Sequence, residues 1–212
     1  MSQFFDRLEQ VRSKWNVLEH PFYQRWTNGE LTKADLAVYS GQYRYAVVAL
    51  AEASTQAADV ADESLAKGLA AHAVEETEHI ALWDGFTDAV GGDAAVSPTA
   101  ETETCMAAWA GTADRPFLET LVTLYTIESG QPVISETKRD GLIERYGYTP
   151  DSPATEYFDL HAELDIEHAE LARKAIEPRL AGADEEALLG VAEATLRGNW
   201  ELLDGVEKLL GR

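Results

Sequence analysis

The sequence predicts an all-α protein built as a single helical bundle. Apolar residues recur at helical spacing along nearly the whole chain, and runs of alternating β-branched residues are absent. The 212 residues suffice to bury one substantial core, and no Pro/Gly/Ser-rich linker divides them. We therefore expect one domain spanning residues 1–212.

Seven helices account for this periodicity, and several of their boundaries coincide with residues that commonly start or stop a helix. Thr32 and Asp114 stand at predicted starts, whereas Gly91 and Gly147 stand at predicted ends. Pro132 falls inside a predicted helix and predicts a kink, because proline removes a backbone donor and clashes with the preceding turn. The predicted helices span residues 2–18, 32–58, 63–91, 99–111, 115–147, 151–180 and 184–210.

The formal net charge of -21 argues against nucleic acid as a partner, because phosphate binding needs a positive surface. The acidic residues are spread along the chain, which indicates solvated helix faces. Adaptation to a salty cytoplasm is a sharper hypothesis, since high ionic strength screens the repulsion between like charges on the chain.

The single cysteine, Cys105, excludes an intrachain disulfide and a thiolate zinc cluster.

No run of about 18 apolar residues is present, and the amino-terminal sequence is polar and unlike a secretory signal. We therefore expect a cytoplasmic protein without a membrane partner. Because homodimers are the commonest soluble oligomers, a homodimer is the oligomeric state that we expect.

One stretch combines histidine and carboxylate at helical spacing: His161-Ala-Glu-Leu-Asp165-Ile-Glu-His168. Positions i, i+4 and i+7 lie on one face of a helix over two turns. The stripe predicts either a ligand face or a polar face in water, and periodicity alone does not decide between them.

A second segment favours the ligand interpretation. Glu76 and His79 stand at i and i+3, the arrangement used by di-iron and di-manganese helical bundles. Glu128 adds a carboxylate in the middle of an apolar helix, where burial costs several kcal/mol without a partner. Mixed carboxylate and imidazole ligands suit iron or manganese. Six side chains exceed what one octahedral ion requires, so two metals are plausible.

These residues resemble those of the haem-oxygenase-like di-metal oxidases and, within them, the CADD-like para-aminobenzoate synthases. The resemblance covers nearly the whole chain, from Leu-Glu-His-Pro-Phe-Tyr-Gln-Arg-Trp at 18–26 to Trp-Glu-Leu-Leu-Asp-Gly at 200–205. It implies a seven-helix bundle of the haem-oxygenase, TenA and PqqC type, without haem. It also implies two iron ions, or iron with manganese, that react with oxygen and need a reductant. The implied ligands are Glu76, His79, Glu128, His161, Asp165 and His168.

The spacing before the first histidine departs from the CADD-like pattern, which usually has extra residues between a glutamate pair and the histidine. Related alkene-forming oxidases use Glu-x-x-His, so we choose Glu76 and keep Glu75 as the alternative.

Within the CADD-like branch, the implied activity is synthesis of para-aminobenzoate for folate from the enzyme's own side chains. Tyr23 matches the tyrosine that supplies the ring, and Lys138 matches the lysine that supplies the amine. The tyrosine usually found before the mid-helix glutamate is Ile127 here, so Tyr125 or Tyr43 would have to relay a radical.

Other interpretations of the same residues remain open. Tyr23 could be a packing aromatic residue, and Lys138 could be a solvated or salt-bridged residue of a Glu-rich helix. The oxidase could act on an external small amino acid or fatty acid. Metal-free rivals are a TenA-type hydrolase with Cys105 as nucleophile and a PqqC-type oxidase, and a non-enzymatic rival is a metal store or interaction module. Metal content separates these alternatives.

Overall fold

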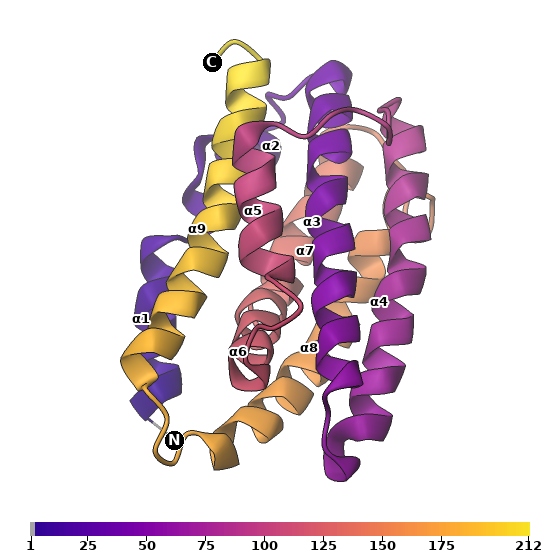
Figure 1. Cartoon of the computed structure of the whole chain (residues 1–212). Coiled ribbons are helices and arrows are strands. Elements are labelled where there is room, and N and C mark those ends of the chain that lie inside the picture. Colours follow the sequence, from indigo (N-terminus) through magenta and orange to yellow (C-terminus); the bar gives the residue numbers. More distant parts are fainter. Residues whose placement is uncertain (1–2) are drawn as a thin grey trace.

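The computed structural model describes residues 3–212 as a bundle of nine α-helices with two short 3-10 helices and no strand among these residues (Figure 1). The α-helices are α1 (Gln3–Lys14), α2 (Pro21–Asn28), α3 (Lys33–Asp59), α4 (Glu63–Val90), α5 (Ala100–Ala110), α6 (Phe117–Glu128), α7 (Gln131–Glu144), α8 (Glu156–Ile176) and α9 (Glu185–Leu209). The 3-10 helices are η1 (Val17–Glu19) and η2 (Glu177–Arg179). The predicted all-α class is therefore confirmed.

The predicted number of seven helices is wrong, first because a separate helix, α2, follows α1. The imidazole of His20 accepts a hydrogen bond from the backbone N–H of Phe22, Pro21 occupies the first turn, and Gly29 ends the helix at φ 73°. The predicted first helix therefore ends at Lys14 rather than at residue 18. Its predicted first residue, 2, lies outside the described residues.

The second difference lies in the predicted helix 115–147, which is broken into α6 and α7 at Ser129 and Gly130. We expected Pro132 to kink a continuous helix. It instead occupies the first turn of α7, where its missing N–H has no intrahelical partner to lose. This break leaves Glu128 as the last residue of α6, buried in the core.

The long helices α3 and α4 pack side by side, and α8 packs against α4, α6 and α7 (Figure 1). Helices α5 and α9 pair on the other side of α3. The centre of the bundle holds large aromatic side chains that are almost completely buried. They include Trp26, Tyr39, Tyr43, Trp83 and Tyr157.

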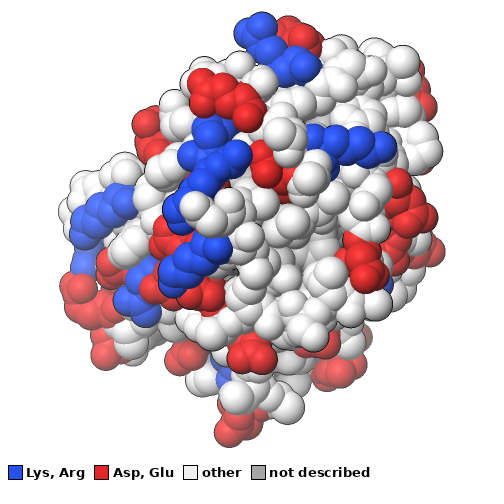
Figure 2. Space-filling model, turned by 90° about the horizontal axis from the view of Figure 1, so that it is seen from above, with Lys and Arg blue, Asp and Glu red and all other residues white. Residues whose placement is uncertain are grey.

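Acidic and basic side chains are interspersed on the end of the bundle seen in Figure 2. Near the C-terminal end of α9, Arg25 pairs with Glu207 and Lys208 pairs with Glu101. The acidic excess of the chain therefore does not form a field of a single sign on this face. No described helix, moreover, combines the length and hydropathy needed to cross a membrane.

A close contact between α2 and α7 positions the middle of α7. The indole N–H of Trp26 donates to the Lys138 carbonyl at 3.1 Å, and this approach depends on Gly141. A Cβ at position 141 would lie 2.6 Å from two atoms of the Trp26 indole, which is fully buried and cannot move aside.

We expect Gly141→Ala to lower the free energy of unfolding by about 1–3 kcal/mol through overpacking against the indole. Urea unfolding measures the change. Gly190→Ala is the matched control, because Gly190 lies in α9 and a Cβ added there would have no atom within 4 Å; it should gain about 0.4–1 kcal/mol. Equal stability of the parent and Gly141→Ala would contradict this account of the α2–α7 contact.

Candidate metal centre

Helices α4 and α8 each carry the pattern His-x-x-x-acid-x-x-His on the face that points into the bundle. On α8 the pattern is the predicted His161, Asp165 and His168, and all three are buried. On α4 it is His72, Glu76 and His79, also buried. His72 was not among the ligands predicted from the sequence. The repeated spacing was the signal that could have found it.

Seven ligand-type side chains converge from three helices, with Glu128 of α6 as the seventh. Two groups have ligand atoms that all lie within 4.8 Å of one another, and Glu76 belongs to both. The first group is His72, Glu76, Glu128 and His168. The second is Glu76, His79 and His161.

Asp165 lies beside these groups, with its Oδ1 3.7 Å from Nδ1 of His168. The six predicted ligands are thus close together in space. Their role as ligands stays a prediction.

The close approaches in this cluster are not oriented as hydrogen bonds. Nε2 of His72 lies 2.8 Å from Oε1 of Glu128, and Nδ1 of His79 lies 3.3 Å from Oε1 of Glu76. As a result, both carboxylate oxygens of Glu76, Glu128 and Asp165 lack a hydrogen-bond partner among the described residues. Three buried carboxylates without donors are costly unless a cation neutralises them. The donor set of hard oxygens and imidazole nitrogens fits iron or manganese.

Hydrogen bonds on the outer side fix two of the imidazoles. Nδ1 of His161 donates to the Tyr157 carbonyl at 2.7 Å, which leaves Nε2 with a free lone pair facing the cluster. Nε2 of His168 donates to Oε2 of Glu75 at 2.9 Å, which leaves Nδ1 free. Such outer partners commonly orient metal-binding histidines. Glu75 is half-buried and supports His168 from outside, whereas Glu76 lies at the centre.

Burial and charge act in opposite directions on these groups. Burial opposes ionisation of Glu76, but the neighbouring imidazoles of His168 and His79 outweigh it and hold its pKa well below the usual range. Burial raises the pKa of Asp165. Burial also lowers the pKa of His161, which favours the neutral imidazole that binds a metal.

Tyr23 and Lys138, the two predicted catalytic residues, lie together in the core and belong to neither group of ligand atoms. Both side chains are 1% exposed, and the Lys138 ammonium lies 5.2 Å from the centre of the Tyr23 ring. The rings of Tyr39 and Tyr43 also face the ammonium, at 5.6 and 4.5 Å. Burial lowers the pKa of Lys138 to about 7, so much of the amine is neutral at neutral pH. The interpretation of Lys138 as a solvated residue is therefore wrong.

A series of aromatic contacts joins the lysine site to the histidine cluster. The Tyr23 hydroxyl lies 2.9 Å from that of Tyr39, whose ring centre lies 5.2 Å from that of Tyr43. The ring centre of Trp83 lies 4.9 Å from that of Tyr43 and 4.8 Å from that of Tyr157. Finally, Tyr157 stacks on the His161 imidazole at 3.9 Å.

The two residues that we considered as relays in place of Ile127 lie in different surroundings. Tyr43 belongs to this aromatic series, whereas Tyr125 packs against Phe5 near α1. The contacts therefore favour Tyr43.

Cys105 lies fully buried in α5, away from any cluster of basic groups, and burial strongly raises the pKa of its thiol. A thiol that stays protonated is a weak nucleophile, so the geometry disfavours the hydrolase with Cys105 as nucleophile.

The profile of the family described as iron-containing redox enzymes, with a haem-oxygenase-like fold, matches residues 43–199. This span includes all seven ligand-type side chains of the histidine and carboxylate cluster. The chain belongs to this family. It is therefore an oxidoreductase of an iron-containing family, and its buried donor set is compatible with a metal site.

Relatives and solved structures agree with this family. The chain is 30% identical to a 4-aminobenzoate synthase of Nitrosomonas europaea, covering 97% of this chain and 91% of that protein. It is 29% identical to a 4-aminobenzoate synthase of Chlamydia muridarum, with 95% and 89% covered.

Among solved structures, a haem-oxygenase-like domain from Shewanella denitrificans superimposes with a TM-score of 0.80 at 21% identity, covering 98% of this chain and 93% of that one. A CADD-like protein from Nostoc punctiforme gives 0.69 at 19% identity, with 97% and 96% covered. The predicted haem-oxygenase-like fold is thus confirmed.

The buried amine predicts a pH-dependent stability. The pKa of Lys138 is about 7 in the folded chain and near 10.5 when unfolded, so between these values the unfolded state binds more protons. The destabilisation by Lys138 is therefore fully present below pH 7 and disappears as the pH rises towards 10.5. We expect Lys138→Met to stabilise the metal-loaded enzyme at pH 6, with the gain shrinking by pH 9.

Urea unfolding of the parent and the variant at each pH measures this difference. The pH dependence of metal binding affects both proteins equally and therefore cancels in the comparison. Lys67→Met is the control, because Lys67 is exposed on α4 and its ammonium stays in water in both states. Parallel stability curves for the parent and Lys138→Met would show that the amine is not desolvated.

Proposed function

We propose that this enzyme makes 4-aminobenzoate (para-aminobenzoate) from its own side chains, with Tyr23 as the source of the ring and Lys138 as the source of the nitrogen. The observation that carries the proposal is the burial of a lysine amine, with a strongly lowered pKa, against the face of Tyr23. The names of the relatives from Nitrosomonas europaea and Chlamydia muridarum support the same product.

We further propose that the histidine and carboxylate cluster holds two metal ions, either two irons or iron with manganese. Glu76 would contribute to the binding of both ions, because its carboxylate belongs to both groups of ligand atoms. His72, Glu128 and His168 would complete one site, and His79 and His161 the other, with Asp165 beside them. Such metals supply oxidation of an aromatic group by molecular oxygen, with electrons from an external reductant.

Formation of 4-aminobenzoate requires a bond from the Lys138 nitrogen to the ring carbon that bears the phenol oxygen, and that oxygen leaves as water. Oxidation by molecular oxygen must then cleave the Cε–Nζ bond of Lys138 and the Cα–Cβ bond of Tyr23, with Cβ becoming the carboxylate.

The new bond to carbon needs a lone pair on the Lys138 nitrogen, and the unprotonated amine supplies it. The aromatic rings around the amine exclude water and leave much of it unprotonated near neutral pH. The same packing holds the nitrogen over the Tyr23 ring at 5.2 Å. This arrangement supplies proximity without the entropic cost of collecting a free amine.

Oxidation of Tyr23 requires loss of a proton as well as an electron. The Tyr39 hydroxyl, 2.9 Å from the Tyr23 hydroxyl, can relay that proton by giving up its own in the same step, because a neutral phenol does not keep a second proton. The electron can leave along the rings of Tyr43, Trp83 and Tyr157, which are in successive contact as far as His161. This route replaces the one that Ile127 removes.

Metal analysis tests the proposed ligands. After anaerobic reconstitution with iron, the parent should hold about two metal ions per chain. Glu76→Ala should lose both, because its carboxylate is shared, whereas His72→Ala should retain about one. His20→Asn is the control, since His20 lies outside the cluster and asparagine can still cap α2. An unchanged metal content in Glu76→Ala would remove Glu76 from the ligand set.

Intact-mass measurement tests the self-consuming reaction. After aerobic incubation with iron and reductant, the parent should lose a tyrosine side chain, and peptide mapping should assign the loss to Tyr23. Tyr23→Phe should form less than about one hundredth of the parent's 4-aminobenzoate, because its ring lacks the phenol. Tyr148→Phe, at a partly exposed position after α7, should behave as the parent does. Undiminished product from Tyr23→Phe would instead indicate an external substrate.

A further inference from the structure

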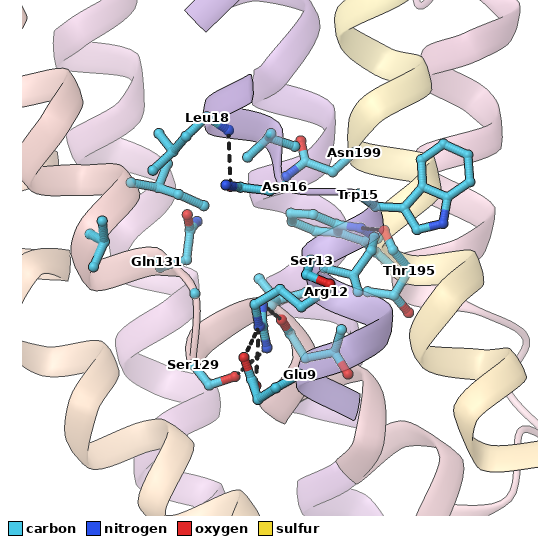
Figure 3. A pocket seen from close by; sticks show the side chains of 18 residues that line it. Glu9, Arg12, Ser13, Trp15, Asn16, Leu18, Ser129, Gln131, Thr195 and Asn199 are labelled. Atoms are coloured by element: carbon cyan, nitrogen blue, oxygen red, sulfur yellow. Dashed lines mark hydrogen bonds and ion pairs between the residues drawn. The ribbon is translucent and has the colours of Figure 1, made fainter. Parts of the chain in front are cut away.

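A second feature of the molecule is a pocket of about 380 Å³ that is open to solvent on one side (Figure 3). None of the seven side chains of the histidine and carboxylate cluster lines it. It lies between α1 with the segment after it, the α6–α7 break and α9. Its volume is at the small end of the range for small-molecule sites, about 300–1,000 Å³. Nothing in the chemistry proposed for Tyr23 and Lys138 uses it.

The floor of the pocket carries buried polar atoms without partners. Gln131 is 3% exposed and Asn199 is 9% exposed, and the side-chain oxygen of each lacks a hydrogen-bond partner among the described residues. Figure 3 shows the two amides on neighbouring parts of the wall. Two unpaired acceptors in a buried wall are costly unless a ligand or water donates to them. These two oxygens suit a ligand that carries N–H or O–H donors.

These amides also lie next to the lysine site. Burial raises the pKa of Tyr43, and the amides of Gln131 and Asn199, close to its hydroxyl, oppose that rise. The centre of the Tyr43 ring lies 4.5 Å from the Lys138 ammonium. The floor of the pocket and the amine that we propose as the nitrogen donor therefore both adjoin Tyr43.

The remaining walls suit an aromatic ring with an anionic end. Trp109, Ile127 and Leu18 provide apolar surface around the middle of the pocket. Arg12 lies on the half-exposed side, where its guanidinium donates to the Thr126 carbonyl at 2.9 Å, to Ser129 at 2.5 Å and to Glu9 at 3.1 Å. Because a guanidinium has five N–H donors, two are left for a carboxylate.

We propose that this pocket binds an aromatic amine with a carboxylate at the opposite end of the ring, and that it is the site from which 4-aminobenzoate leaves the enzyme. The amine donates its two hydrogens to the oxygens of Gln131 and Asn199, and the carboxylate accepts from Arg12. The identity of the ligand as product rests on the proposed function. The complementarity of donors, ring and anion rests on the pocket alone.

Isothermal titration calorimetry of the iron-loaded enzyme tests this inference. The titration is anaerobic and without reductant, so that no turnover occurs. We expect saturable binding of 4-aminobenzoate. Benzoate, which lacks the amine, and aniline, which lacks the carboxylate, should each bind about tenfold more weakly, the effect of losing hydrogen bonds at one end. This comparison uses the unmodified enzyme, so it does not depend on any variant folding.

Two variants locate the site. Asn199→Leu, which keeps the side-chain size but removes the acceptor, should weaken 4-aminobenzoate about tenfold while leaving benzoate unchanged. Arg12→Gln should weaken 4-aminobenzoate and benzoate together. Arg7→Gln is the matched control on the same helix, because Arg7 pairs with Glu185 outside this pocket, and it should change neither.

The outcomes separate this inference from the proposed function. Binding that shows these preferences in an enzyme that makes no 4-aminobenzoate would leave the pocket standing and overturn the function. Synthesis of 4-aminobenzoate with no measurable binding, with equal affinity for benzoate, or with an Asn199→Leu variant that binds as the parent does, would overturn the pocket and leave the function standing.

Discussion

Three carboxylates buried at the centre of a helical bundle, with four imidazoles around them, are the constraint on which the rest of this structure depends. The oxygens of Glu76, Glu128 and Asp165 have no hydrogen-bond donor among the described residues, so positive charge nearby has to offset their desolvation and their mutual repulsion. The imidazoles around them lower the pKa of Glu76, and the donor set is compatible with a metal site. Glu76 is central because it belongs to both groups of ligand atoms. If this cluster holds metal as we propose, the packing of α4, α6 and α8 is coupled to metal binding, because the ligands come together only in the folded chain.

The bundle separates two chemical environments that need opposite conditions. The metal cluster concentrates charge, whereas Lys138 requires a site poor in charge so that its amine loses its proton. Aromatic rings surround the amine and exclude water from it, and they are in successive contact from Tyr23 to His161. The same rings therefore insulate the lysine electrostatically and connect it to the cluster through ring contacts.

The break between α6 and α7 joins three parts of the molecule within a few residues. It ends α6 at Glu128, which belongs to the metal cluster, and it begins α7 at Gln131, which lines the pocket. Lys138 follows two turns later on α7, where Gly141 lets Trp26 approach and hold the helix. A continuous helix would not bring all these side chains to their present positions, because the turn at Ser129 and Gly130 redirects the chain.

The sequence by itself determined the helical class, the approximate limits of the long helices and most of the cluster, because these follow from local periodicity. Helical spacing brings His161, Asp165 and His168 onto one face whatever surrounds the helix. Tertiary structure decided what spacing cannot express. It brought His72 into the cluster, set Glu75 outside and Glu76 inside, and turned Pro132 from an expected kink into the start of α7. It also buried Lys138 among aromatic rings contributed by α2, α3, α4 and α8. A lysine's pKa depends on which distant residues exclude water from it, and that information lies in the packing rather than in the order of neighbours along the chain.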